Sequence, residues 1–313
     1  MKNLKNLLPS LAALAGLFTA YYFPDSDAHP AAVRPYFAII LLVVLAVPLV
    51  LFAVGVVIPS LKEQYERKAP FYAGVLLFLS ILNILTVKTA VLPVLYFPSL
   101  DRVFGVLVED APFIGKCFLY SLQLLGWFGG AAAGILTGIA IGFNRHARYW
   151  IYPLVRVLGP IPSTAWIPLV LVSFPTVVSA SAFLIGLAVW FPTSVLTSSG
   201  IASIQNSYFE AAATLGASGP YTILRVGIPA AMPHMFIGLF NGTTSSFITL
   251  VTAEMLGAKY GIGWYINWQK DMMAYANVYA GLIVMSISCY CIITLLFRVR
   301  DKLLVWQKGV IKW

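Results

Sequence analysis

Charged residues are scarce in this chain of 313 residues. Asp, Glu, Lys and Arg make up 10% of it, and 60% of the residues are hydrophobic. A typical soluble domain has about 25% charged residues. The mean hydropathy of +0.88 points the same way. These values exclude a soluble globular domain and a disordered chain, and they are typical of a protein whose solvent is mostly lipid.

Cysteine, histidine and catalytic motifs are also scarce. The three cysteines form no C-x-x-C pair, and the three histidines are far apart, so we expect neither a disulfide framework nor a metal site. The chain has no G-x-x-x-x-G-K-[ST] loop for nucleotides, no G-x-S-x-G and no H-E-x-x-H. No two acidic residues lie together in an apolar stretch, as a proton relay would need. We therefore do not expect an enzyme.

Eight apolar stretches are long enough, or nearly so, to cross a bilayer as helices, which takes about 20 residues. They are residues 7–23, 35–59, 71–91, 118–143, 150–174, 178–199, 230–253 and 277–297. The first stretch could alternatively be interpreted as a signal peptide. The fifth contains four prolines, each of which removes a backbone N–H, so we expect a kinked or partly broken segment there.

The distribution of charge predicts an orientation. With the N-terminus in the cytoplasm, eight spans return the C-terminus there, and 14 of the 20 Lys and Arg residues lie inside. Counting the acids as well, the net charge is +10 inside and −1 outside, which together give the +9 of the chain. Cytoplasmic loops carry an excess of Lys and Arg. Both termini are therefore expected in the cytoplasm, and the basic charge does not require a nucleic-acid partner.

The fourth span has a glycine at every fourth position. Such a stripe lets two helix backbones approach closely in lipid. Static close packing is the first interpretation, and a helix that slides or rocks against a neighbour is the alternative. The glycines are Gly126, Gly130, Gly134, Gly138 and Gly142.

The seventh span is unusually polar for a membrane helix. Its hydroxyl groups can bond to the preceding turn of their own helix, or they can line a hydrophilic path, and their number favours the path. For Glu254, which is near the outer end of the span, solvation is the simple alternative. The residues predicted to line the path are Asn241, Thr244, Ser245, Thr249 and Glu254.

Residues 201–229, between the sixth and seventh spans, predict a helix–turn–helix elbow. Gly216 suits the position after the end of a first helix because it tolerates positive φ, and Pro220 suits the first turn of a second. Ala211, Ala212 and Leu215 give this exposed element an apolar surface. Such a patch indicates a protein partner.

The elbow resembles the EAA loop of ABC-importer permeases, in which E-A-A is followed by three residues, G, nine residues and I-x-L-P. The matching residues are Glu210, Ala211, Ala212, Gly216 and Pro229, with Val226 and Ile228 as conservative replacements. Further runs resemble the nitrate, sulfonate, taurine and bicarbonate class of these permeases. They are P-I-P at 160–162, F-P at 191–192, T-L-G-A-S at 214–218, P-A-A-M-P at 229–233, A-E-M-L-G-A at 253–258 and G-I-G at 261–263.

The resemblance implies an all-α integral membrane protein with a helical bundle like that of type I ABC importers. A six-span core at residues 66–313 would follow an extra N-terminal transmembrane hairpin at residues 1–65. The chain would be the permease subunit in a bacterial-type inner membrane. Its partners would be a second permease copy, in a homo- or heterodimer, two cytoplasmic ABC ATPases and an extracytoplasmic solute-binding protein.

The resemblance also implies a division of labour. ATP and Mg would be bound by the ATPases, and no cofactor by this chain. The residues implied to couple to the ATPases are Glu210, Ala211, Ala212, Leu215, Gly216 and Pro220.

The implied solute is a small oxyanion or sulfonate such as nitrate, bicarbonate, taurine or an alkanesulfonate. The outside net charge of −1 provides no electrostatic attraction for an anion. One alternative is a secondary transporter or channel that works without ATP. It predicts uptake without ATPase subunits and inverted internal repeats, of which the sequence shows no convincing case. A non-transporting membrane scaffold is another alternative.

Overall fold

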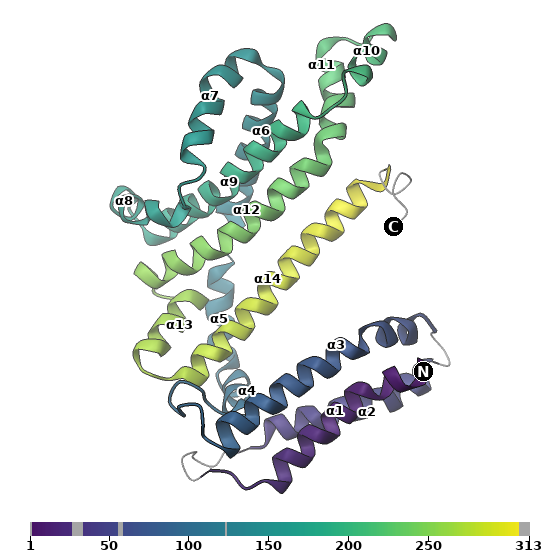
Figure 1. Cartoon of the computed structure of the whole chain (residues 1–313). Helices are drawn as coiled ribbons and strands as arrows, with labels where there is room; N and C mark the ends of the chain where they lie inside the picture. The colour runs from purple at the N-terminus through teal and green to yellow at the C-terminus, as the bar shows by residue number, and fades with distance from the viewer. Residues whose placement is uncertain (1, 27–33, 56–58, 123, 307–313) are drawn as a thin grey trace. The chain divides into compact units, whose positions relative to one another are not determined.

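The computed structural model describes residues 2–26, 34–55, 59–122 and 124–306, and these form helices joined by turns (Figure 1). This part of the chain contains no β-strand, so the predicted all-α architecture is confirmed. The chain forms two compact units. Unit 1 comprises residues 1–114 and 268–282, and unit 2 comprises residues 115–267 and 283–313. The division of the sequence into a hairpin at 1–65 and a core at 66–313 stays a prediction.

Five helical segments are long and apolar enough to cross a membrane: Arg67–Lys88, Ala111–Phe143, Val177–Ala202, Gly219–Leu256 and Tyr275–Leu303. A sixth consists of two helical pieces, Arg145–Leu158 and Ser163–Ser173, bent by 89°. With two shorter apolar helices, Leu8–Tyr22 and Tyr36–Ala46, they account for the eight expected stretches. The broken fifth span is thereby confirmed. The predicted span 35–59 continues into residues 56–58, which lie outside the described part.

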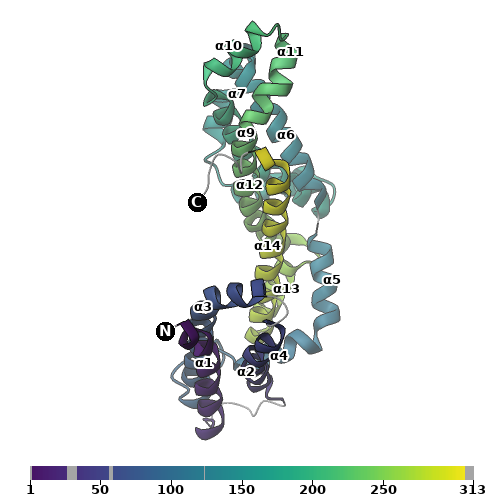
Figure 2. The same cartoon turned by 90° about the vertical axis from the view of Figure 1, so that its right-hand side faces the viewer.

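In unit 1, α1 (Lys2–Tyr22), α2 (Tyr36–Gly55) and α3 (Pro59–Asn83) lie side by side (Figures 1 and 2). Small residues let α1 pack closely, because Ala12 and Ala13 are buried against Leu41 of α2 and Leu76 of α3. This packing makes α1 part of the core of unit 1, which favours a structural helix over a signal peptide.

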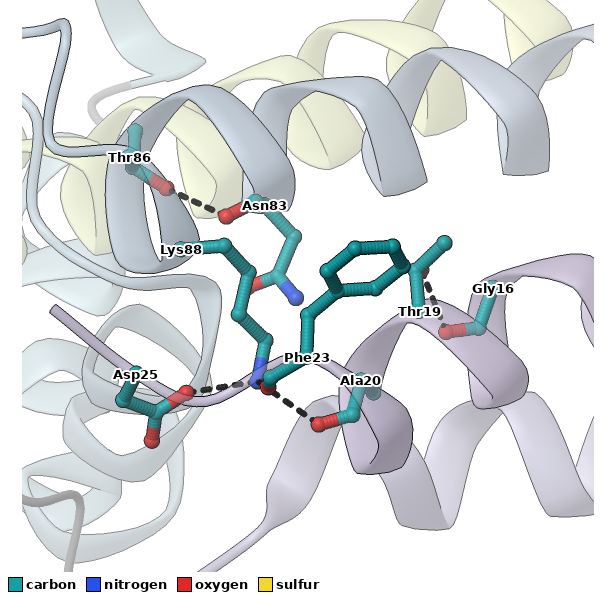
Figure 3. A network of polar contacts seen from close by, with 8 residues as sticks. All are labelled: Gly16, Thr19, Ala20, Phe23, Asp25, Asn83, Thr86 and Lys88. Carbon is teal, nitrogen blue, oxygen red and sulfur yellow. Dashed lines mark hydrogen bonds and ion pairs between the residues drawn. The ribbon is translucent and has the colours of Figure 1, made fainter.

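Lys88 holds the end of α1. It is the last residue of η1 (Ile84–Lys88), a π-helical turn that continues α3. Its Nζ donates to the carbonyl oxygens of Ala20 at 2.7 Å and Phe23 at 2.6 Å, and pairs with Asp25 at 2.6 Å (Figure 3). The Lys88 side chain is only 8% exposed. Since the last carbonyls of a helix have no partner within it, this cation satisfies groups that α1 leaves open.

A second link in unit 1 joins α4 (Leu100–Glu109) to α2. The Asp101 carboxylate accepts the N–H of Phe37, in the first turn of α2, at 2.8 Å. Burial raises the pKa of Asp101, while the bond from Phe37 opposes that rise. A carboxylate from one helix therefore caps the N-terminus of another.

In unit 2, α9 (Val177–Ala202) packs against both α6 (Leu124–Phe143) and α12 (Ile228–Gly257), as both views show (Figures 1 and 2). All five glycines of the stripe in α6 face α9. An added Cβ at Gly126 or Gly130 would overlap the backbone of Ala182 or Gly186. At Gly134, Gly138 and Gly142 it would overlap the side chains of Thr193, Thr197 and Ile201. The two backbones are therefore in direct contact, and a sliding motion of this contact stays a prediction.

The remaining helices complete the two units. They are α5 (Ala111–Ser121), α7 (Arg145–Leu158), η2 (Ser163–Trp166), α8 (Ile167–Ser173), α10 (Asn206–Thr214), α11 (Gly219–Thr222), η3 (Ile223–Gly227), α13 (Ile262–Asp271) and α14 (Tyr275–Leu303).

Candidate functional site

A cavity of about 550 Å³ lies in unit 2 between α7, the turn at residues 159–164, α9 and α12. Its walls are apolar on α9. Polar side chains come from the other three elements, and they are Arg156, Ser163, Thr164, Ser245 and Thr249. A cavity that combines apolar walls with a few convergent polar groups is the usual form of a small-molecule site.

The broken fifth span forms one wall of this cavity. α7 ends at Leu158, and the chain cannot continue as a regular helix because Pro160 and Pro162 lack a backbone N–H. The chain then turns into η2 and α8. The Ser163 hydroxyl is hydrogen-bonded to the Thr249 hydroxyl, which ties this turn to α12.

Two of the predicted path residues line the cavity. These are Ser245 and Thr249, while Asn241 and Thr244 are exposed on the same helix. The hydroxyls of Thr244 and Thr249 also donate to the carbonyl oxygen four residues earlier, so part of the polarity of α12 is satisfied within the helix. The role of these residues in a path stays a prediction.

Glu254, the fifth predicted path residue, does not line this cavity. It is 1% exposed, so the interpretation of a solvated carboxylate is wrong. Its Oε2 accepts the N–H of Gly263 at 2.8 Å, and Ser121 Oγ accepts the N–H of Ile262 at 2.8 Å. Both N–H groups are in the first turn of α13, where backbone donors have no partner within the helix. Glu254 and Ser121 therefore cap α13 from two other helices.

Two glycines make room for this contact. Gly261 has a φ of +130°, and a side chain there would overlap the Glu254 carboxylate. Gly263 lies against α12, where an added Cβ would be 2.6 Å from the carbonyl oxygen of Val251. The run A-E-M-L-G-A followed by G-I-G thus encodes a tight contact between the end of α12 and the start of α13.

A second cavity of unit 2, of about 510 Å³, borders the other face of α12. Its lining is mostly apolar, and α12 contributes Thr243, Ser246 and Glu254 to it. The Thr243 hydroxyl already accepts a hydrogen bond from Trp127 Nε1 at 2.9 Å and donates one to the carbonyl of Leu239. The polar residues of α12 are therefore divided between two faces, and the first cavity suits a hydrophilic solute better.

The predicted helix–turn–helix elbow is present. α10 ends at Thr214, and Gly216 follows with a φ of +77°. The N–H groups of Gly216 and Ala217 donate to the carbonyls of Ala213 and Ala212, which is the bond pair of a Schellman motif. α11 then starts with Pro220 in its first turn. One difference from the expectation is that α11 continues through η3 into α12, so the second helix belongs to the membrane span.

The elbow lies beyond the ends of α9 and α12, at the top of Figure 1, and is largely exposed. Leu215 is 88% exposed, and Glu210 and Ala211 are exposed as well. The ring of Phe209 in α10 packs edge-on against that of Phe143 in α6, with 6.4 Å between centroids. The elbow is thus anchored through Phe209, while Leu215 presents an exposed apolar side chain.

Ser121, Ser163, Thr164 and Arg156 were not predicted from the sequence. Ser121 lies in an apolar span without a spacing pattern that marks it, and Ser163 is followed by Thr164 directly after P-I-P. Arg156 is one of the 14 Lys and Arg residues expected on the cytoplasmic side, and the structure places it on the cavity wall. Its position four residues before Pro160 is the one feature that links it to the break in the span. Among the described residues, no three His, Cys, Asp or Glu side chains lie together as metal ligands.

Comparisons with known proteins identify relatives of this chain. Residues 130–304, more than half of it, match the family described as binding-protein-dependent transport system inner membrane component. The chain is 30% identical over 222 residues to a putative ABC transporter permease of Methanocaldococcus jannaschii, covering 67% of this chain and 82% of the relative.

Two further relatives have more specific names. The chain is 30% identical over 187 residues to the taurine transport system permease of Escherichia coli, covering 60% of this chain and 68% of that protein. It is also 30% identical over 185 residues to the nitrate import permease of Synechococcus elongatus, covering 56% and 66%. The region matched by the family contains the cavity, the elbow and the contact of Glu254 with Gly263.

Proposed function

Because the chain belongs to the family of binding-protein-dependent ABC-importer permeases of the inner membrane, we propose that it carries a small oxyanion or sulfonate through the membrane in an ATP-driven importer. One observation carries this proposal: a single helical segment, Gly219–Leu256, runs from the exposed elbow to the polar cavity. Movement applied at the elbow can therefore reach the residues that surround the solute.

The solute class is supported by the cavity and by the relatives. The cavity contains hydroxyl groups and one guanidinium, which are hydrogen-bond donors for an anion. The taurine and nitrate permeases to which the chain is similar are named for small solutes with an acidic group or a negative charge. We propose path roles for Ser245 and Thr249, which line the cavity, and for Asn241 and Thr244, which are exposed on the same helix.

The partners follow from the same reasoning. A cytoplasmic ATPase would receive the elbow through Glu210, Ala211, Leu215 and their neighbours, since these are exposed and partly apolar. Two such ATPases, which bind ATP and Mg, would act on two permease copies, and a solute-binding protein would deliver the solute from outside. Both termini would lie in the cytoplasm, on the side of the elbow.

Uptake measurements in vesicles test the proposal. The permease would be reconstituted with its ATPase and its solute-binding protein, and labelled nitrate, bicarbonate, taurine and an alkanesulfonate would be offered in turn. We expect uptake of at least one of them, and we expect it to stop when ATP is replaced by a non-hydrolysable analogue. Uptake in vesicles that contain the permease alone would instead establish a secondary transporter or channel.

A further inference from the structure

We propose that Arg156 binds the anionic group of the solute within the cavity, an assignment that deepens the proposed function and rests on it. Arg156 is in the last turn of α7 and is one of the residues that line the cavity. Of the sixteen residues that the structure places around this cavity, Arg156 alone carries a formal charge. The cavity is therefore positive, and no carboxylate on its wall neutralises it.

The guanidinium of Arg156 has its donors available. It forms no hydrogen bond or ion pair with any residue in the described part of the chain. Arg148, two turns earlier in the same helix, behaves differently, because its Nε and Nη2 donate to the carbonyls of Ile141 at 3.1 Å and Gly142 at 2.8 Å. One arginine of α7 thus caps the end of α6, while the other is exposed at the wall of the cavity with its donors unused.

The surroundings suit an oxyanion. A guanidinium offers five N–H donors in a planar fork that matches groups with two or three oxygens. The hydroxyls of Thr164 and Ser245 belong to the same cavity lining and can donate to the remaining oxygens, whereas the Ser163 hydroxyl is already bonded to Thr249. Apolar side chains such as Phe191 and Ile248 lower the local dielectric constant, which strengthens the attraction between the charges.

This assignment supplies the attraction that the outer loops lack. With their predicted net charge of −1, those loops do not concentrate anions, so any attraction that this chain itself exerts on an anion would come from the membrane region. The competing explanation is structural, because a cation in the last turn of a helix interacts favourably with the helix C-terminus. The two explanations differ in one measurable property, which is the preference of the cavity for anions over cations.

Labelling of a cysteine in the cavity measures this preference without any transport. The exposed cavity residue Ile161 would be changed, Ile161→Cys, in a chain whose three native cysteines are serines. Its reaction rates with a sulfonated and a trimethylammonium methanethiosulfonate reagent give an anion-to-cation ratio. Adding Arg156→Gln should lower this ratio about fivefold or more, as expected for the loss of one nearby charge in a partly wet site. Arg156→Lys should keep most of it.

Arg145→Gln is the matched control, because Arg145 is exposed at the start of the same helix and does not line the cavity. It should leave the labelling ratio unchanged. If the Ile161→Cys protein gives the same labelling ratio with and without Arg156→Gln, the assignment is overturned. So would an equal fall of the ratio with Arg145→Gln, because the effect would then come from the general charge of α7.

Uptake by the reconstituted importer separates this assignment from the proposed function. Arg156→Gln should reduce uptake of the anionic solute about tenfold or more, with Arg145→Gln near wild type. Should Arg156→Gln import the solute normally, the assignment fails and the proposed function stands. Should the wild-type complex import no oxyanion or sulfonate while the labelling ratio still depends on Arg156, the proposed solute class fails and the anion preference of the cavity stands.

Discussion

The carboxylate of Glu254 accepts the backbone N–H of Gly263 at 2.8 Å, which joins the end of α12 to the start of α13. Ser121 of α5 completes the arrangement by accepting the neighbouring N–H of Ile262. Glu254, which was expected to face the solute, thus binds the backbone at the start of α13. The C-terminal part of α12, beyond the cavity, is therefore held in place by a buried carboxylate.

Glu254→Ala should destabilise this junction, because the N–H of Gly263 would be buried without a partner, at a cost of about 1–3 kcal/mol. Glu254→Gln keeps an acceptor oxygen and should cost less. The measurement is hydrogen exchange of residues 261–267, with the exposed Glu109→Ala as a control. If neither Glu254→Ala nor Glu254→Gln changed the rate of hydrogen exchange, the carboxylate would not hold α13.

Gly130→Ala tests the contact between α6 and α9. Its methyl group would overlap the carbonyl oxygen of Gly186, and overpacking of this kind costs about 1–3 kcal/mol. Gly129→Ala is the matched control, since its methyl group would have no atom within 4 Å and Ala favours a helix by about 1 kcal/mol over Gly. In thermal unfolding of the detergent-solubilised protein, Gly130→Ala should melt lower and Gly129→Ala no lower than wild type. Equal melting of the two variants would contradict the close contact.

Lys88→Met should release the end of α1. The change removes the donor for the carbonyls of Ala20 and Phe23, and hydrogen bonds to a charged group contribute about 1.5–3 kcal/mol. The pair with Asp25 adds little, since Asp25 is 59% exposed. Hydrogen exchange of residues 16–26 should become about tenfold faster or more, and the exposed Lys68→Met should not change it. Unaltered exchange in Lys88→Met would show that the core packing alone holds α1.

Gly216→Val should abolish uptake and leave the protein inserted in the membrane. The φ of +77° strains a β-branched residue, whereas no atom would obstruct its side chain. Gly219→Val is the control, because Gly219 has neither a positive φ nor a neighbour within 4 Å. Uptake and solute-stimulated ATP hydrolysis are the measurements. Normal transport by Gly216→Val would mean that the elbow does not drive the permease.

The stability of unit 1 should depend on pH through Asp101. Burial raises the pKa of this carboxyl in the folded state, so ionisation costs more there than in the unfolded chain. Its contribution to stability is therefore largest at pH values below its ordinary pKa of about 4 and is lost as pH rises through the raised value. The melting temperature of wild type should exceed that of Asp101→Asn by a larger margin at low pH than at pH 7. A difference that is constant with pH would contradict the shift.

The sequence predicts features that depend on neighbours in the chain. The eight apolar stretches, the break in the fifth span and the turn at Gly216 all follow from hydropathy, proline or glycine within a few residues. Contacts between distant residues were not predictable in this way. Ser121 is 141 residues from Ile262, and nothing in the order of residues shows that Glu254 is buried beside Gly263.

The helix that begins at Gly219 and reaches Leu256 has a consequence for changes at the elbow. At about 1.5 Å per residue, its 38 residues span roughly 57 Å. A twist of this rod about its own axis turns Ser245 and Glu254 together, because both project from it. A change that reorients the elbow therefore alters the fit at both places at once.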